Sequence, residues 1–97
     1  MIKSFRGTAT EDIFDGTQSK AARKALPIVL HLKAHRLLDL INGAASLNDL
    51  AIPPGNRLEP LKGDRKGFHS IRINDQYRIV FRWLGADAEE VEIVDYH

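Results

Sequence analysis

Residues 68–84 read FHSIRINDQYRIVFRWL, and this stretch decides the fold. Two runs of strand length, 68–74 and 77–84, are joined by a polar connection so short that they must form an antiparallel hairpin. Successive side chains of a strand point to opposite faces, so Ile71 and Ile73 share one face of the first run. The matching face of the second run is expected to lie in the core and consists of Tyr77, Ile79, Phe81 and Trp83.

The other face of the hairpin is basic. By the same alternation, Ser70 and Arg72 of the first run share this face with Arg78 and Arg82 of the second run. We expect the face to be open to solvent, as one face of an antiparallel sheet commonly is. Alternating arginines are as often a solvated surface as a binding site, so the pattern alone leaves both interpretations open.

Two further runs of strand length flank the hairpin, at 57–62 and 90–96. The turns 63–67 and 85–89 connect them to it, and connections this short predict a meander of antiparallel strands. The alternating residues 2–6 predict a short first strand.

A long amphipathic helix is expected to cover the apolar face of the sheet. It begins at Pro27, which fits the first turn of a helix, and it ends at Gly43. Its apolar residues step by four, three, four and three and form a single stripe: Leu30, Ala34, Leu37, Ile41 and Ala44.

Shorter helical segments are expected on either side of this helix. One stops at Gly16, with Thr8 or Thr10 capping its start, while 19–26 fits either a helix or a loosely ordered connection. Residues 46–49 have the pattern of a weak capping box for one extra turn. The predicted fold class is therefore α+β, with a first strand and helices packed on one face of an antiparallel sheet.

Composition limits the class of protein. A chain of 97 residues, 43% of them hydrophobic, makes one domain spanning 1–97. The absence of cysteine excludes disulfides and thiolate metal sites, so we expect a cytoplasmic protein. No segment approaches the roughly 20 apolar residues of a membrane span. His31 and His35 have a metal-compatible spacing, but no carboxylate or third ligand follows on that helix face, so no metal site is predicted.

Charge is unevenly distributed along a chain whose formal net charge is only +1. Six of the fourteen Lys and Arg residues lie between positions 62 and 82, whereas the last eleven residues carry five carboxylates and no cation. A local cationic surface in so short a chain suggests a site for a polyanion, with RNA the foremost candidate.

Cleavage of RNA without a metal requires a base for the 2′-hydroxyl proton, cations for the phosphate oxygens and an acid for the leaving 5′-oxygen. The candidates for proton transfer are Glu59, Asp95, Tyr96 and His97. Each has another interpretation: Tyr96 could stack on a base or pack in the last strand, Asp95 could pair with an arginine, and the terminal His97 could be frayed.

Three motifs resemble a known family. The runs NRLEPLKGDRKG at 56–67, SIRINDQYRI at 70–79 and VDYH at 94–97 closely resemble the HigB-type (host inhibition of growth) toxins, or plasmid maintenance system killer proteins, of the RelE/ParE toxin–antitoxin superfamily. The likeness extends over the whole chain. It implies a small α+β toxin that enters the ribosomal A site and cuts mRNA with no metal or cofactor.

The resemblance also implies roles for individual residues. Lys62 matches a residue that contacts the scissile phosphate, and Arg78 matches the arginine that stabilises the transition state. Tyr96 matches a tyrosine that stacks on or orients the RNA. Asp95 and His97 beside it would contribute to proton transfer.

Glu59 departs from the family pattern, because several relatives have histidine there. A carboxylate on a cationic face is ionised and can act as a base, but it cannot supply the positive charge of a protonated histidine. The identity of the general base is therefore open. Further RNA contacts are expected from Arg65, Lys66, Arg72 and Arg82.

The resemblance further implies partners: the ribosome with its mRNA, and a HigA-type helix-turn-helix antitoxin from the same operon. It implies no membrane association. Two alternatives from other functional classes stay open. One is a toxin that binds without cutting, for instance on DNA gyrase; the other is an inactive copy that serves only as an antitoxin-binding module.

Overall fold

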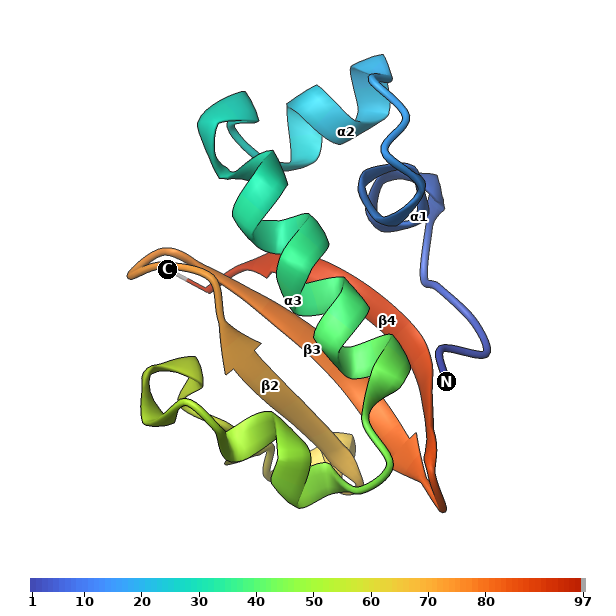
Figure 1. Ribbon diagram of the computed structural model, residues 1–97, viewed down its shortest axis with the longest axis vertical. Helices are drawn as coiled ribbons and strands as arrows, with labels where there is room; N and C mark the ends of the chain where they lie inside the picture. The colour runs from blue at the N-terminus through green and yellow to red at the C-terminus, as the bar shows by residue number, and fades with distance from the viewer. Residues whose placement is uncertain (97) are drawn as a thin grey trace.

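The computed structural model describes residues 1–96 and has two layers, with helices on one face of a sheet (Figure 1). The helices of this part are α1 (Thr8–Asp15), α2 (Lys20–Ala25) and α3 (His31–Gly43). The strands are β1 (Glu59–Pro60), β2 (Phe68–Arg72), β3 (Tyr77–Leu84) and β4 (Asp87–Asp95). They pair antiparallel in chain order, so the predicted α+β class and meander are confirmed.

The core lies between α3 and the apolar face of the hairpin. Ile71 of β2 and Ile79 and Phe81 of β3 are fully buried there, and Tyr77 and Trp83 pack at its margin. Figure 1 shows α3 crossing this face of the sheet. The helix contributes the predicted stripe, with Leu30 only partly buried. The alternation in the sequence therefore identified the core face correctly.

A bulge in β4 adjusts which of its residues face the core. Val80 of β3 pairs with Glu92, but Arg82 pairs with Glu89, so β4 has one extra residue between these pairs. Glu90 takes up the extra length in a left-handed conformation, with φ 51°. As a result Ala88, Val91 and Ile93 all face the core although their spacing breaks strict alternation.

This bulge also explains why the expected first strand, residues 2–6, is not continuous. The segment runs parallel to β4 but forms only two isolated bridges, Ile2 with Ala88 and Phe5 with Val91. Between them the backbone N–H of Glu90 donates to the Ser4 hydroxyl at 2.9 Å instead of continuing a ladder. The prediction of a regular strand was wrong, because the partner strand changes register at that point.

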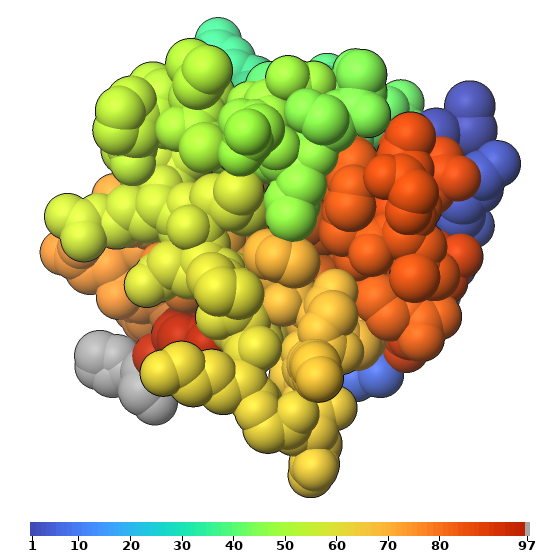
Figure 2. All heavy atoms as spheres, turned by 90° about the horizontal axis from the view of Figure 1, so that it is seen from below, coloured from blue at the N-terminus to red at the C-terminus, as the bar shows by residue number. Residues whose placement is uncertain are grey.

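The segment expected as a strand at 57–62 pairs over only two residues, Glu59 with Ser70 and Pro60 with His69. Ahead of it, Arg57 adopts a left-handed conformation with φ 48° and turns the chain back towards the sheet. Viewed from below, the chain of the fifties and sixties occupies much of the molecular surface and reaches the C-terminal end of β4 (Figure 2). Because the Arg57 carbonyl accepts a hydrogen bond from Arg78, a residue of β3 that is buried, this segment covers part of the second face of the sheet.

The remaining helical predictions are confirmed with one exception. Neither Thr8 nor Thr10 caps α1, because its N-cap is Gly7 and the Thr10 hydroxyl bonds the backbone of β4 instead. Residues 19–26, left open by the sequence, form α2 with Ser19 as its cap, at 3.0 Å from the N–H of Ala22. A 3-10 turn, Ile28–Leu30, follows Pro27 and leads into α3. None of the helices within residues 1–96 is long and apolar enough to cross a membrane.

The predicted capping box is present. The Asp49 carboxylate accepts hydrogen bonds from the backbone N–H groups of Ser46 at 3.1 Å and Ala45 at 2.9 Å. These bonds lower the pKa of Asp49 below its ordinary value. Because the folded pKa is the lower one, this contribution to stability is complete above the unfolded value of about 4 and is lost as pH falls through the folded value.

Replacing Asp49→Asn should therefore lower the urea unfolding midpoint at pH 7, and the difference from wild type should shrink as pH falls below about 4. The control is Asp64→Asn, whose carboxylate forms no ion pair within residues 1–96. The urea midpoints of wild type and both variants are measured at pH 7 and at a pH below about 4. A difference that persists undiminished at low pH would contradict this role of the carboxylate.

Candidate active site

Arg78 is the centre of the candidate site, and its environment differs from the one expected. The sequence predicted an arginine on an open face, but the residue is only 8% exposed. Its Nε donates to the Ser70 hydroxyl at 2.8 Å, and its Nη2 donates to the carbonyl of Arg57 and, at 3.4 Å, to that of Ser70. Alternation gave the correct face; the segment that returns through Arg57 covers it.

Two exposed residues complete the surroundings of this guanidinium. The Glu59 carboxylate lies 3.0 Å from Nη2, and the side chain of Glu59 is 61% exposed. The ring of Tyr96 lies over the guanidinium, with 5.7 Å between Arg78 Cζ and the ring centroid, in a cation–π contact. Arg78 is thus held from within by uncharged acceptors and meets solvent through a carboxylate and an aromatic ring.

Two hollows lie beside this group and share Tyr96. One of about 280 Å³ is polar and is lined by Arg57, Glu59, Arg72, Asn74, Asp75, Arg78 and Tyr96. The other, of about 370 Å³, is lined by Leu61, Lys62, Arg65, Val80, Val94, Asp95 and Tyr96. The structure therefore brings together seven of the ten residues singled out by the sequence, namely Glu59, Lys62, Arg65, Arg72, Arg78, Asp95 and Tyr96.

The arginines of the hairpin are not free cations. Arg72 lies directly across from Arg78 in the sheet register, but its guanidinium pairs with Asp75 and thereby lowers the pKa of that carboxyl. Arg82 pairs with Glu89 at 2.8 Å, which raises the pKa of Arg82, and it lines neither hollow. The expected open face of three arginines is therefore locally neutralised, and RNA contact by Arg82 stays a prediction.

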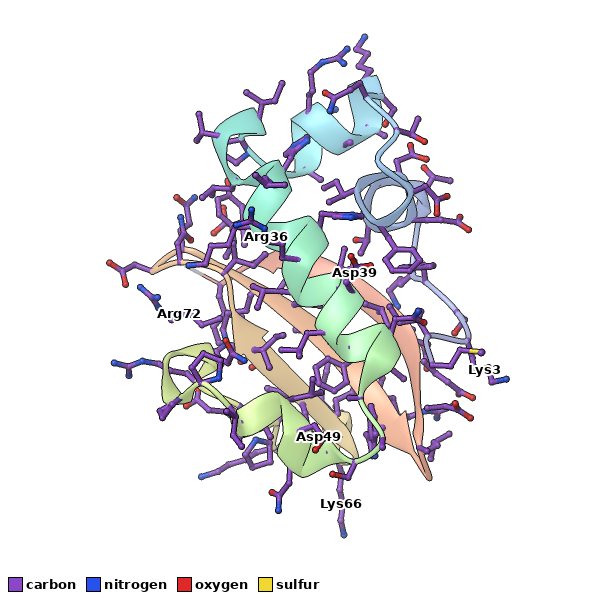
Figure 3. The ribbon with its side chains drawn as sticks, in the orientation of Figure 1. Lys3, Arg36, Asp39, Asp49, Lys66 and Arg72 are labelled. Atoms are coloured by element: carbon purple, nitrogen blue, oxygen red, sulfur yellow. The ribbon has the colours of Figure 1, made fainter. Side chains whose placement is uncertain are left out.

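Uncompensated positive charge lies instead in the loop before β2. Within residues 1–96, Lys62, Arg65 and Lys66 form no ion pair. Arg65 rests over the ring of Phe68 at 5.6 Å, which keeps its guanidinium beside the larger hollow. Lys66 extends away from the sheet, well apart from Arg72 (Figure 3), and lines neither hollow.

The end of the chain is anchored by a residue that the sequence did not single out. The side chain of Gln76 donates to the Asp95 carboxylate at 3.0 Å, and the backbone carbonyl of Gln76 accepts from the backbone N–H of Tyr96 at 2.7 Å. For Ser70, the sequence did contain a signal, because strand alternation places its side chain on the same face as Arg78. For Gln76 it contained no signal, because a turn residue has no periodic pattern. His97, predicted to be catalytic, lies outside the described residues.

The histidines of α3 are occupied by protein groups. His31 Nε2 lies 2.8 Å from the carbonyl oxygen of Leu26, and His35 Nε2 lies 3.3 Å from the Asp39 carboxylate. A carboxylate does follow on this helix face, contrary to the sequence interpretation, because Asp39 is one turn beyond His35. Among residues 1–96 no three His, Asp or Glu side chains gather in a way that could hold a metal ion.

The comparison with known families now decides what kind of protein this is. The family model of the HigB-like toxins, described as the RelE-like toxin of type II toxin–antitoxin system HigB, matches residues 3–97. The chain belongs to this family. Membership makes it the toxin component of a type II toxin–antitoxin system, with an antitoxin as its partner.

Individual relatives agree with this placement. The chain is 43% identical over 65 residues to Toxin HigB-1 of Vibrio cholerae, a match that covers 67% of this chain and 68% of the relative. It is 32% identical to Endoribonuclease HigB of Proteus vulgaris over 101 residues and the full length of both. The resemblance to HigB-type toxins is therefore confirmed.

Solved structures support the fold. A mutant of YafQ from E. coli superimposes with a TM-score of 0.68 at 18% identity, covering 99% of this chain and 92% of that one. The YoeB–YefM complex from Staphylococcus aureus matches with a TM-score of 0.57 at 17% identity, covering 100% and 98%. At these identities the likeness concerns the RelE-like fold alone.

The two facing arginines of this toxin should differ sharply in what they contribute to folding. Replacing Arg78→Met leaves the buried Ser70 hydroxyl and the Arg57 carbonyl without a donor, and should cost about 2 kcal/mol of unfolding free energy. The matched change Arg72→Met removes an exposed ion pair and should cost less than about 0.5 kcal/mol. Urea denaturation measures both. Equal shifts would contradict the burial of Arg78.

Proposed function

We propose that this toxin is an endoribonuclease that cuts mRNA in the ribosomal A site and so stops translation. The observation that carries the proposal is the setting of Arg78. This buried arginine lines the polar hollow and lies under the ring of Tyr96, the residue that this hollow shares with the larger one. A full-length relative named as an endoribonuclease supports it.

The chemistry follows from what RNA cleavage demands. The 2′-oxygen attacks the adjacent phosphorus, the bond from phosphorus to the 5′-oxygen breaks, and the products are a 2′,3′-cyclic phosphate and a 5′-hydroxyl. Negative charge grows on the phosphate oxygens during this step, and fixed cations stabilise it most when water is excluded. Arg78 and Lys62 are the proposed cations, because they line the two hollows on either side of Tyr96.

Two proton transfers must accompany this step. The proposed acceptor of the 2′-hydroxyl proton is Glu59, since its carboxylate lies 3.0 Å from the guanidinium that would hold the phosphate. Asp95, in the other hollow, and His97 are the proposed contributors on the leaving-group side. Tyr96 is more than half exposed and is proposed to stack on a base next to the scissile bond.

The remaining cations are proposed to guide the strand. Arg65 and Arg72 line the hollows and would contact phosphates next to the cleavage point, while Lys66 and Arg82 would contact the RNA further along. The proposed partners are the ribosome with its mRNA and a HigA-type helix-turn-helix antitoxin. These partners make the cytoplasm the proposed compartment.

Expression of the toxin without its antitoxin, followed by primer extension on cellular mRNA, tests this proposal. Wild type should produce discrete breaks within codons, and Arg78→Ala, Lys62→Ala and Tyr96→Ala should each reduce them by about 100-fold or more. The control is Arg6→Ala, which removes an arginine that pairs with Glu90 and lines neither hollow; its cleavage should equal that of wild type.

Other outcomes would overturn the proposal. Intact mRNA accompanied by DNA damage would indicate a gyrase-directed toxin. Absence of growth arrest by the wild-type toxin would indicate an inactive antitoxin-binding module. Full cleavage by all three site variants would mean that the reaction takes place elsewhere on the molecule.

A further inference from the structure

Ser70 is a buried hydroxyl at the centre of the sheet face that carries the site. It lies in β2, opposite Glu59 of β1 on one side and Val80 of β3 on the other, and it is 1% exposed. Its Oγ accepts from Arg78 Nε at 2.8 Å, and its carbonyl lies 3.4 Å from Nη2 of the same side chain. No other side chain in residues 1–96 bonds that Nε.

This contact determines which edge of the guanidinium is left for a ligand. Ser70 and the Arg57 carbonyl take the edge formed by Nε and Nη2. The remaining edge, Nη1 with Nη2, meets the Glu59 carboxylate through Nη2, while Nη1 bonds to no protein atom within residues 1–96. A phosphate that binds with two parallel hydrogen bonds must therefore use this edge.

We infer that Ser70 is a positioning residue for the cleavage reaction, an assignment that rests on the proposed endoribonuclease function. Its hydroxyl fixes the rotation of the guanidinium, so that the Nη1 and Nη2 edge points into the site before RNA arrives. Without the hydroxyl, the buried Nε–H has no acceptor and the side chain turns to find one. A displacement of about 1 Å at a charge-stabilising group costs on the order of 100-fold in rate.

The same fold contains a matched hydroxyl that cannot have this role. Thr10 of α1 is 2% exposed, and its Oγ1 accepts from the backbone N–H of Ile93 at 3.0 Å. This bond joins α1 to the backbone of β4 and involves no atom of Arg78. Removing either hydroxyl leaves one buried N–H donor unpaired, so both changes should destabilise the fold, but only the change at Ser70 affects the guanidinium of Arg78.

The test uses purified toxin and ribosomes programmed with mRNA, at toxin concentrations that span saturation. Ser70→Ala should lower the maximal cleavage rate by about 10- to 100-fold, with little change in the toxin concentration that gives half the maximal rate. Thr10→Val should cleave at the wild-type rate even though its urea midpoint also falls. Ser70→Thr, which retains the hydroxyl, should recover most of the rate.

Two additional variants keep the test decisive. If Ser70→Ala does not fold, Ser70→Thr is compared with Ser70→Val. Valine has the same shape as threonine and lacks only the hydroxyl. The double variant Ser70→Ala, Arg78→Ala should be no slower than Arg78→Ala alone, because Ser70 acts only through that guanidinium.

The inference is overturned if Ser70→Ala cleaves as fast as wild type, if Thr10→Val slows cleavage equally, or if the losses of the double variant multiply. Failure of the proposed function gives a different result. In that case wild type itself leaves the programmed mRNA intact, and both the function and the positioning role are rejected together.

Discussion

A guanidinium buried in the second face of the sheet is the constraint on which the rest of the site depends. A buried charge is tolerated only where its donors are paired. Ser70 supplies a hydroxyl from the neighbouring strand, and Arg57 supplies a carbonyl from a left-handed backbone turn. The chain must therefore return across the sheet after α3, and this return places Glu59 beside Arg78 and Lys62 in the neighbouring hollow.

Charge in this toxin is divided between paired and unpaired groups. The acidic end of the chain neutralises arginines: Glu89 holds Arg82, and Glu90 holds Arg6. The loop with Lys62 and Lys66 has no such partners among the described residues, and it borders the hollow that Tyr96 closes. We therefore expect this loop to attract the RNA. Arg78, which is paired with Glu59, would bind the scissile phosphate.

Much of the fold was predictable because the hairpin has a strict two-residue period and α3 has a clear apolar stripe. The broken first strand was not, since it depends on the bulge at Glu90, a left-handed residue that no composition rule marks. Within the site, alternation placed Ser70 and Arg78 on one face correctly. Alternation could not show that this face is covered, because the loop through Arg57 that covers it has no periodic pattern. The role of Gln76 was not predictable for the same reason, since it lies in the turn between β2 and β3.

The most direct test of this arrangement is the exchange of the Arg78 Nε–H with solvent, followed by NMR on ¹⁵N-labelled toxin. A proton held by the Ser70 hydroxyl in a residue that is 8% exposed should give a resolved resonance that exchanges far more slowly than that of Arg6, an exposed arginine. The resonance should move or broaden in Ser70→Ala and stay unchanged in Thr10→Val. An Arg78 Nε–H that exchanges as fast as that of Arg6 would contradict the buried, preset guanidinium.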